Sequence, residues 1–150
     1  MAITTASEVA DYFIDIANET GSFISNLKLQ KLLYYAQAWH LALYDTPLFD
    51  EDFEAWVHGP VIPALFEEYK EFGWKPILKD VKKPNFMPEL EIFLDEITEA
   101  YFIREGLELE MMTTREAPWI QARKTLPRDE HSDAIISKEL MREYYKERAA

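Results

Sequence analysis

Apolar side chains recur at helical spacing through the first 45 residues and predict two helices there. The first helix is expected over residues 6–20, where four apolar residues share one face: Val9, Tyr12, Phe13 and Ile16. Thr5 and Glu8 have the spacing of a capping box at its start, in which each side chain bonds an unpaired amide. Gly21 favours its end, because glycine readily adopts the left-handed conformation that closes helices.

The second helix is expected over residues 26–44, with Ser25 as its N-terminal cap. Apolar residues cover most of its circumference, since Tyr35, Trp39 and Ala42 widen the stripe that the leucines form. A helix that is apolar on most sides is packed by neighbours on most sides. This segment is therefore predicted to be the buried central helix of the domain.

Residues 53–58 alternate with a period of two, which predicts a short strand. The alternation places three side chains on each face: Phe53, Ala55 and Val57 on one, Glu54, Trp56 and His58 on the other. The first face carries small and branched side chains, which suit packing against the helices. The second face is then exposed, and an aromatic side chain flanked by polar groups has the composition of an interface anchor. The reverse assignment stays open, because a shift of one residue exchanges the faces. Gly59 and Pro60 are expected to end the strand, and residues 76–78 are its expected pairing partner.

The remaining pattern predicts further helices and few strands. A helix that starts at Pro63 is expected to close at Gly73, and a long one around residues 90–105 to end at Gly106. Short helices are expected over residues 107–113 and from Pro118, extended chain at 135–136, and a last helix after Ser137. The fold class is thus mainly α: residues 1–150 form one compact helical domain around the central helix, with a short two-stranded β element.

The net charge of the chain limits the kinds of partner that it is expected to bind. The chain has 150 residues, 16 Lys and Arg, 28 Asp and Glu, and a net charge of −12. Such a charge repels phosphate backbones, so nucleic acid is not the expected partner. The absence of targeting signals and of long apolar runs predicts a cytoplasmic protein that does not enter membranes. The acids Asp50, Glu51 and Asp52 before the strand are expected to face a basic partner.

Signatures of catalysis or of cofactor binding are few. Cysteine is absent, which excludes thiol catalysis and Cys-ligated metals, and the four glycines are too scattered for a phosphate-binding loop. The three histidines lie on separate elements without metal-ligand spacing, so neither a metal nor a cofactor is expected. His40 is interpreted as a core histidine with a hydrogen-bond partner. A hydrolase that uses His58 or His40 with nearby carboxylates remains an alternative, as does a DNA-binding autoregulator.

Four segments resemble one known family, the Panacea or SocA-like antitoxin domain, also described as phage-associated GepA-like. They are residues 29–40 (LQKLLYYAQAWH), residues 47–61 with PLF and FEAWVHGPV, residues 113–119 and residues 136–144. Thr114 and Ala117 depart from the His and Gly usual in the third segment. The residues that carry the family signature here are Leu29, Gln30, Lys31, Leu32, Tyr34, Tyr35, Gln37, Trp39, Gly59, Pro60, Pro118 and Trp119.

The resemblance implies a mainly helical antitoxin that neutralises a cognate protein toxin by direct binding, and not an enzyme. It also implies an alternative, because one branch of the family delivers its toxin to an ATP-dependent protease as an adaptor. The residues themselves predict where a partner would bind. The predicted contacts are Glu54, Trp56 and His58 on the strand, with Asp50, Glu51 and Asp52 before it.

Overall fold

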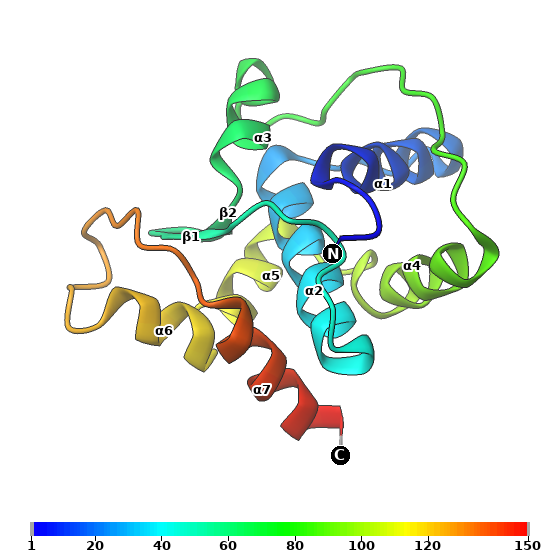
Figure 1. Ribbon diagram of the computed structural model, residues 1–150. Helices are drawn as coiled ribbons and strands as arrows, with labels where there is room; N and C mark the ends of the chain where they lie inside the picture. The colour runs from blue at the N-terminus through cyan, green and yellow to red at the C-terminus, as the bar shows by residue number, and fades with distance from the viewer. Residues whose placement is uncertain (1, 150) are drawn as a thin grey trace.

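The computed structural model describes residues 2–149 and is mainly helical (Figure 1). The elements in chain order are α1 (Ala6–Thr20), α2 (Asn26–Tyr44), β1 (Glu54–Trp56), β2 (Gly59–Val61), α3 (Pro63–Glu68), the 3₁₀-helix η1 (Lys70–Phe72), α4 (Pro88–Tyr101), α5 (Gly106–Thr113), α6 (Ala117–Arg123) and α7 (Lys138–Ala149). The predicted fold class is confirmed. None of the described helices has the combined length and apolarity that crossing a membrane requires.

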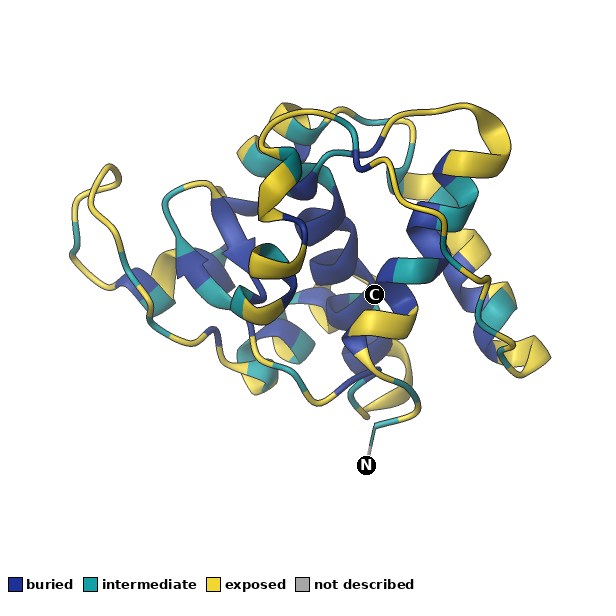
Figure 2. Ribbon diagram, turned by 90° about the horizontal axis from the view of Figure 1, so that it is seen from above, coloured by how far each residue is buried: buried dark blue, intermediate teal, exposed yellow. Residues whose placement is uncertain are grey.

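Helix α2 is the centre of the domain, as predicted. It packs against α1, α4, α5, α7 and strand β2, and Figure 1 shows these elements arranged around it. The Ser25 hydroxyl caps it by accepting a hydrogen bond from the Lys28 amide at 3.1 Å. The buried residues concentrate on α2 and on the faces turned toward it, while exposed residues lie on the periphery (Figure 2). Removal of this apolar surface from water is the main stabilising contribution to the fold.

Only half of the predicted capping box at α1 forms. The Thr5 hydroxyl accepts a hydrogen bond from the Glu8 amide at 3.2 Å, as expected. The Glu8 carboxylate instead accepts from the Thr4 hydroxyl at 2.7 Å. The amide of Ala6 donates to the Glu51 carboxylate at 3.1 Å, so a residue distant in sequence satisfies one unpaired amide of this helix start.

The predicted strand forms, but its predicted partner was wrong. Strands β1 and β2 make an antiparallel hairpin in which Glu54 faces Val61 and Trp56 faces Gly59. Residues 59–61 can fold back beside β1 because Gly59 adopts a φ of +100°. Residues that carry a Cβ rarely adopt this backbone conformation, whereas glycine does so at little cost. Residues 76–78 lie elsewhere: the Ile77 amide donates to the Ile24 carbonyl at 2.8 Å.

The other edge of β1 is covered by the chain before α7. The Ala55 amide donates to the Ala134 carbonyl at 2.9 Å, and the Ile136 amide donates to the Phe53 carbonyl at 2.8 Å. This agrees with the prediction of extended chain at residues 135–136. Strand β1 is therefore held on both sides, which fixes the direction of its side chains.

Two predicted helix ends differ from the structure. The helix from Pro63 divides into α3 and η1 before Gly73. Helix α4 ends at Tyr101, and Gly106 is the first residue of α5. Gly106 does not close a helix here; it lies beside the start of α2, with the place of a Cβ in van der Waals contact, 3.4 Å from the Lys28 amide nitrogen.

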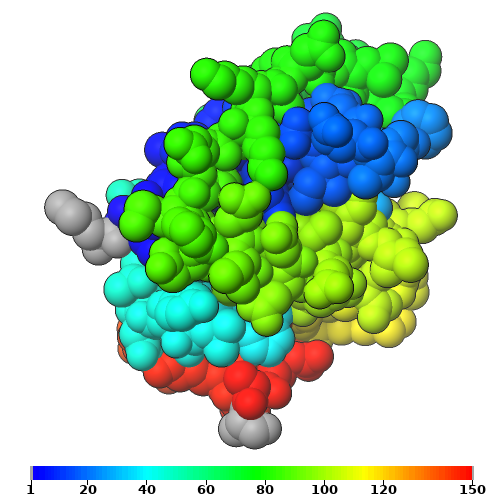
Figure 3. Space-filling view, turned by 90° about the vertical axis from the view of Figure 1, so that its right-hand side faces the viewer, coloured from blue at the N-terminus to red at the C-terminus, as the bar shows by residue number. Residues whose placement is uncertain are grey.

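The connection between η1 and α4 lies on the outside of the domain. Residues 74–87 run across α1 toward α4, which the space-filling view shows as the green band over the blue helix (Figure 3). The Asn18 side-chain amide donates to the Lys79 carbonyl at 3.0 Å and holds the two segments together. This path places Trp74 beside the connection between α1 and α2, where the candidate site lies.

Candidate functional site

The strand presents its two faces as predicted over residues 53–56, but Val57, predicted on the packed face, is half-buried in the turn and lines the hollow beside Trp56. Phe53 and Ala55 are buried in the core, whereas Glu54 and Trp56 are half-buried on the opposite face and His58 is exposed in the turn. The Trp56 indole donates to the Glu54 carboxylate at 2.8 Å. The reverse assignment of faces is thus excluded, and Trp56 lies where a partner could reach one side of it.

A hollow of about 490 Å³ opens beside Trp56, between the hairpin, the first turns of α2 and η1. Aromatic rings form its walls, with the Trp56 ring 5.1 Å from that of Phe66 and the His58 ring 5.8 Å from that of Trp74. His58 also donates to the Glu110 carboxylate from Nδ1 at 3.1 Å. We call this hollow the Trp56 pocket.

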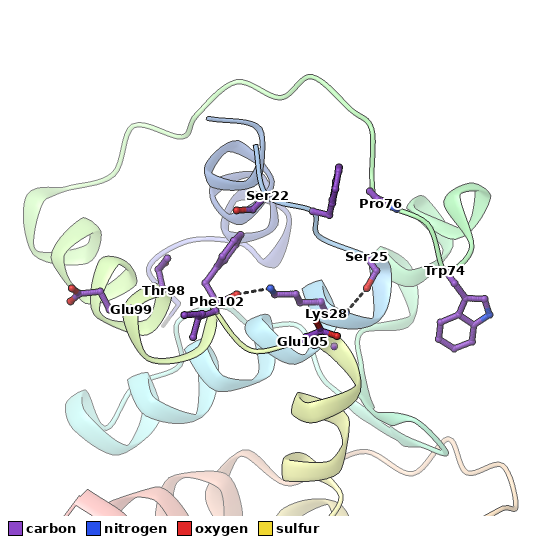
Figure 4. Close-up of a pocket in the computed structure, with 12 residues that line it drawn as sticks. Ser22, Ser25, Lys28, Trp74, Pro76, Thr98, Glu99, Phe102 and Glu105 are labelled. Atoms are coloured by element: carbon purple, nitrogen blue, oxygen red, sulfur yellow. Dashed lines mark hydrogen bonds between the residues drawn. The ribbon is translucent and has the colours of Figure 1, made fainter. Parts of the chain in front are cut away.

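A second hollow of about 730 Å³ lies on the other side of Trp74, between the α1–α2 and α4–α5 connections (Figure 4). The Lys28 side chain reaches across its base to the Phe102 carbonyl, and its ammonium lies 4.6 Å from the centre of the Phe102 ring (Figure 4). Glu99 and Glu105 contribute acidic groups to its lining. We call this hollow the Phe102 groove.

Exposed apolar side chains gather around the Phe102 groove. Phe23 is 71% exposed, Trp74 73% and Ile103 88%, and all three line the groove. Large apolar side chains that lie exposed around one hollow are typical of sites of protein interaction, whereas singly scattered ones are not. Sequence reasoning missed these residues, because they come from three separate connections. The sequence does mark them in one way: they are bulky apolar residues that lie outside any amphipathic pattern.

The acidic residues predicted to face a partner have contacts within the chain. Glu51 accepts the hydrogen bond from the Ala6 amide, and Asp52 forms an ion pair with Lys138 at the start of α7. Asp50 is exposed, and its carbonyl accepts from the Lys138 ammonium at 3.1 Å. These contacts join the loop to α1 and α7. A role of the three acids in partner binding stays a prediction.

The histidines give little support to catalysis. His40 is buried, donates from Nδ1 to the Thr46 carbonyl at 2.7 Å, and has its pKa lowered by burial. It is the core histidine that the sequence predicted. Within residues 2–149, no Ser, Thr or Tyr hydroxyl is hydrogen-bonded to the ring of His40 or His58. In the same residues, no three His, Asp or Glu side chains meet in a group that could hold a metal ion.

The polar signature residues of α2 fix loops to the central helix. Gln37 is fully buried; its carbonyl accepts from the Leu48 amide at 2.7 Å and its amide donates to the Phe49 carbonyl at 2.7 Å. Gln30 accepts from the Ile62 amide at 2.9 Å. Because buried backbone groups need partners, these two side chains position the loop before β1 and the chain after β2.

Other signature residues join α2 and the hairpin to the later helices. The Tyr35 hydroxyl donates to the buried Glu116 carboxylate at 3.0 Å, and burial raises the pKa of Glu116. The Trp119 indole donates to the Trp56 carbonyl at 2.9 Å. Pro118 lies in the first turn of α6, where its missing amide is not needed. These residues therefore hold the hairpin and the Trp56 pocket in place.

Comparison with known proteins identifies the family of the chain. Residues 29–120 match the model of the family described as "Antitoxin SocA-like, Panacea domain". The chain is 35% identical over 108 residues to the "Antitoxin SocA" of Caulobacter vibrioides (strain NA1000 / CB15N). The match covers 72% of this chain and 57% of that relative, so the chain spans little more than half of its length. No solved structure gives a significant match. The chain belongs to the SocA-like antitoxin family that carries the Panacea domain.

Proposed function

We propose that the chain is an antitoxin that neutralises a cognate protein toxin by binding it directly. Membership of an antitoxin-like family and the relative named an antitoxin support this role. In this role the chain acts through a protein-binding surface and catalyses no reaction. The hydrogen bonds of His40 and His58 support that choice, since neither ring is joined to a hydroxyl that it could activate within residues 2–149.

The observation that carries the proposal is the exposed apolar surface around Trp74. Phe23, Trp74 and Ile103 border the Phe102 groove, and Trp74 also borders the Trp56 pocket. Tryptophan and other aromatic residues dominate the energetics of protein interfaces when a partner excludes water from them. A toxin that covers this surface would remove three large apolar side chains from water, which favours association.

Charge around the groove suits a partner with a basic surface. Glu99 and Glu105 line the groove, and Lys28, which also lines it, is engaged with the Phe102 carbonyl. The whole chain carries a net charge of −12. Opposite charges at the edge of an interface mainly raise the rate of association. Apolar contacts at the centre and acids around them are thus the expected form of the toxin-binding surface.

Co-expression with the toxin tests this proposal. The toxin is sought as the product of the gene beside that of this chain. The wild-type chain is expected to restore growth, and the double variant Trp74→Ala with Ile103→Ala to fail, because loss of two interface anchors weakens binding by roughly 1,000-fold. Growth of cells that express both proteins is the measurement.

The matched control is Ile92→Ala, which removes an isoleucine that is 61% exposed on α4 outside both hollows. It is expected to neutralise as well as the wild type. Circular dichroism and cellular abundance should show that all three proteins fold. Full rescue by the folded double variant would contradict the proposed surface, and failure of the wild-type chain to rescue would contradict the proposed function.

A further inference from the structure

A third hollow, of about 330 Å³, lies between the last turns of α2, the start of α4 and the segment before α1. None of the described residues that line it also lines the Trp56 pocket or the Phe102 groove. Its walls are mainly apolar and are formed by Ile3, Tyr44, Met87, Leu90 and Phe93. His40 and Glu89 contribute polar atoms to the lining. We call this hollow the His40 pocket.

The hydrogen bond between His40 and the main chain determines which ring nitrogen carries the proton. Nδ1 lies 2.7 Å from the Thr46 carbonyl oxygen, which can only accept, so Nδ1 is the donor and carries the hydrogen. Burial lowers the pKa of His40, which keeps the ring uncharged at neutral pH. In an uncharged ring with the hydrogen on Nδ1, the other nitrogen, Nε2, has a free lone pair and acts as an acceptor.

Nε2 of His40 has no hydrogen-bond partner within residues 2–149. The residue is only 2% exposed, so this acceptor is largely withdrawn from bulk water. Nε2 is nevertheless not sealed in the core: among the described residues, the unpartnered side-chain atoms that are fully enclosed belong to Tyr34, Tyr69 and Arg104. The remaining exposure of His40 therefore includes Nε2 and opens into the pocket. Buried polar groups are normally hydrogen-bonded, so this acceptor is matched only when a ligand supplies a donor.

The surroundings of His40 define the rest of the ligand. The imidazole ring lies 4.8 Å from the Tyr44 ring and 5.4 Å from the Phe93 ring, which it meets edge to face. Aromatic walls of this kind suit another aromatic ring. The exposed Glu89 carboxylate is a second acceptor and disfavours an anionic ligand. An uncharged aromatic ring with one hydrogen-bond donor thus matches both the walls and the polar atoms.

We propose that the His40 pocket binds a phenol, whose hydroxyl donates to Nε2 of His40 and whose ring packs against Tyr44 and Phe93. The volume of about 330 Å³, at the low end of the roughly 300–1,000 Å³ found for small-molecule sites, suits a single ring. The phenol is either a free small molecule or the side chain of a tyrosine in a partner. This site goes beyond toxin neutralisation and does not rest on it, because it lies apart from the Phe102 groove.

Titration of the purified chain with phenol and with toluene tests the site. The two probes have nearly the same shape, but toluene has no hydrogen to donate. Binding is followed through the ring nitrogens of His40 in ¹⁵N-labelled protein. Phenol is expected to bind with roughly millimolar affinity, as its few atoms allow, and to shift the Nε2 resonance with a saturation curve. Toluene should leave the Nε2 resonance near its free value.

Two asparagine variants assign the preference for a donor to Nε2. In His40→Asn the side-chain amide still donates to the Thr46 carbonyl, but no acceptor reaches the place of Nε2. The ratio of phenol to toluene affinity, measured on the Phe93 main-chain amide, is expected to fall about five-fold, as loss of one hydrogen bond predicts. His131→Asn replaces an exposed histidine outside the pocket and should keep the wild-type ratio.

Three results would overturn the proposal: no saturable shift at about 10 mM phenol, an Nε2 resonance that phenol leaves unchanged, or the same affinity ratio in His40→Asn as in the wild type. The Nε2 resonance of the wild type decides the question even where His40→Asn does not fold. N-acetyltyrosinamide then distinguishes the two sources of the phenol. Binding as tight as that of phenol indicates a tyrosine of a partner, and binding of phenol alone indicates a free small molecule.

Discussion

Replacing Gly59 by alanine is expected to lower the free energy of unfolding by about 3 kcal/mol or more, through strain and overpacking together. Gly59 has a φ of +100°, which an alanine adopts only with strain. A Cβ there would lie 2.6 Å from the Lys31 Cε and 2.9 Å from the Thr113 Oγ1. Lys31 is fully buried, so it has little room to move away. Chemical denaturation measures the loss.

The matched control is Gly21→Ala. Gly21 also has a positive φ, of +67°, but the place of its Cβ has no described atom within 4 Å. This variant should therefore show backbone strain alone, of about 1 kcal/mol. The difference between the two losses in free energy of unfolding gives the cost of overpacking where the hairpin lies close to α2. Equal losses in Gly59→Ala and Gly21→Ala would show that the hairpin moves away from Lys31 without cost.

Replacing Trp39 by alanine is expected to cost about 3 kcal/mol, the low end for deletion of a large aromatic side chain. Trp39 is half-buried on α2, so part of its ring already contacts water. Its indole donates to the Tyr101 hydroxyl at 2.7 Å, and its ring lies 5.0 Å from that of Tyr145. The residue thus links α2 with α4 and α7. Urea unfolding followed by far-ultraviolet circular dichroism measures the change.

Trp39→Phe separates the contribution of ring packing from that of the indole hydrogen bond. Phenylalanine keeps most of the packing against Tyr145 and loses only the indole donor, so the expected loss is about 1 kcal/mol. A Trp39→Ala protein that unfolds at the wild-type urea concentration would refute the structural role. The residue would then be a candidate for partner contact instead.

Local patterns in the sequence were enough to predict the main elements. The spacing of apolar residues placed α1 and α2, and Ser25 correctly marked the start of the central helix. The alternation at residues 53–58 gave both the strand and the exposed side of Trp56. These features depend on neighbours in the chain, so their signal lies in the chain itself.

Contacts between distant residues explain the errors. Nothing near Gly106 shows that it meets the start of α2, and nothing near Glu51 shows that it caps α1. Residues 59–61 pair with β1 because the chain reverses before Gly59. From the sequence, Gly59 was interpreted only as the end of the strand. Each of these features is decided by packing between segments that are far apart in sequence, which overrides local preference.

The candidate site was predicted only in part for the same reason. Trp56 and His58 were identified from a local alternation. Trp74, Phe23 and Ile103 come from separate connections, and only the folded chain brings them to one groove. Lys31 was identified as part of a family signature, but its complete burial became visible only in three dimensions.

Titration of the purified chain with its purified toxin by isothermal calorimetry tests the central claim most directly. We predict a one-to-one complex with a dissociation constant below about 1 μM, as expected for a specific interface. The Trp74→Ala variant should bind roughly 30-fold more weakly or worse, and Ile92→Ala should bind as the wild type does. Absence of a complex, or equal affinity of the wild-type and Trp74→Ala proteins, would contradict neutralisation through this surface.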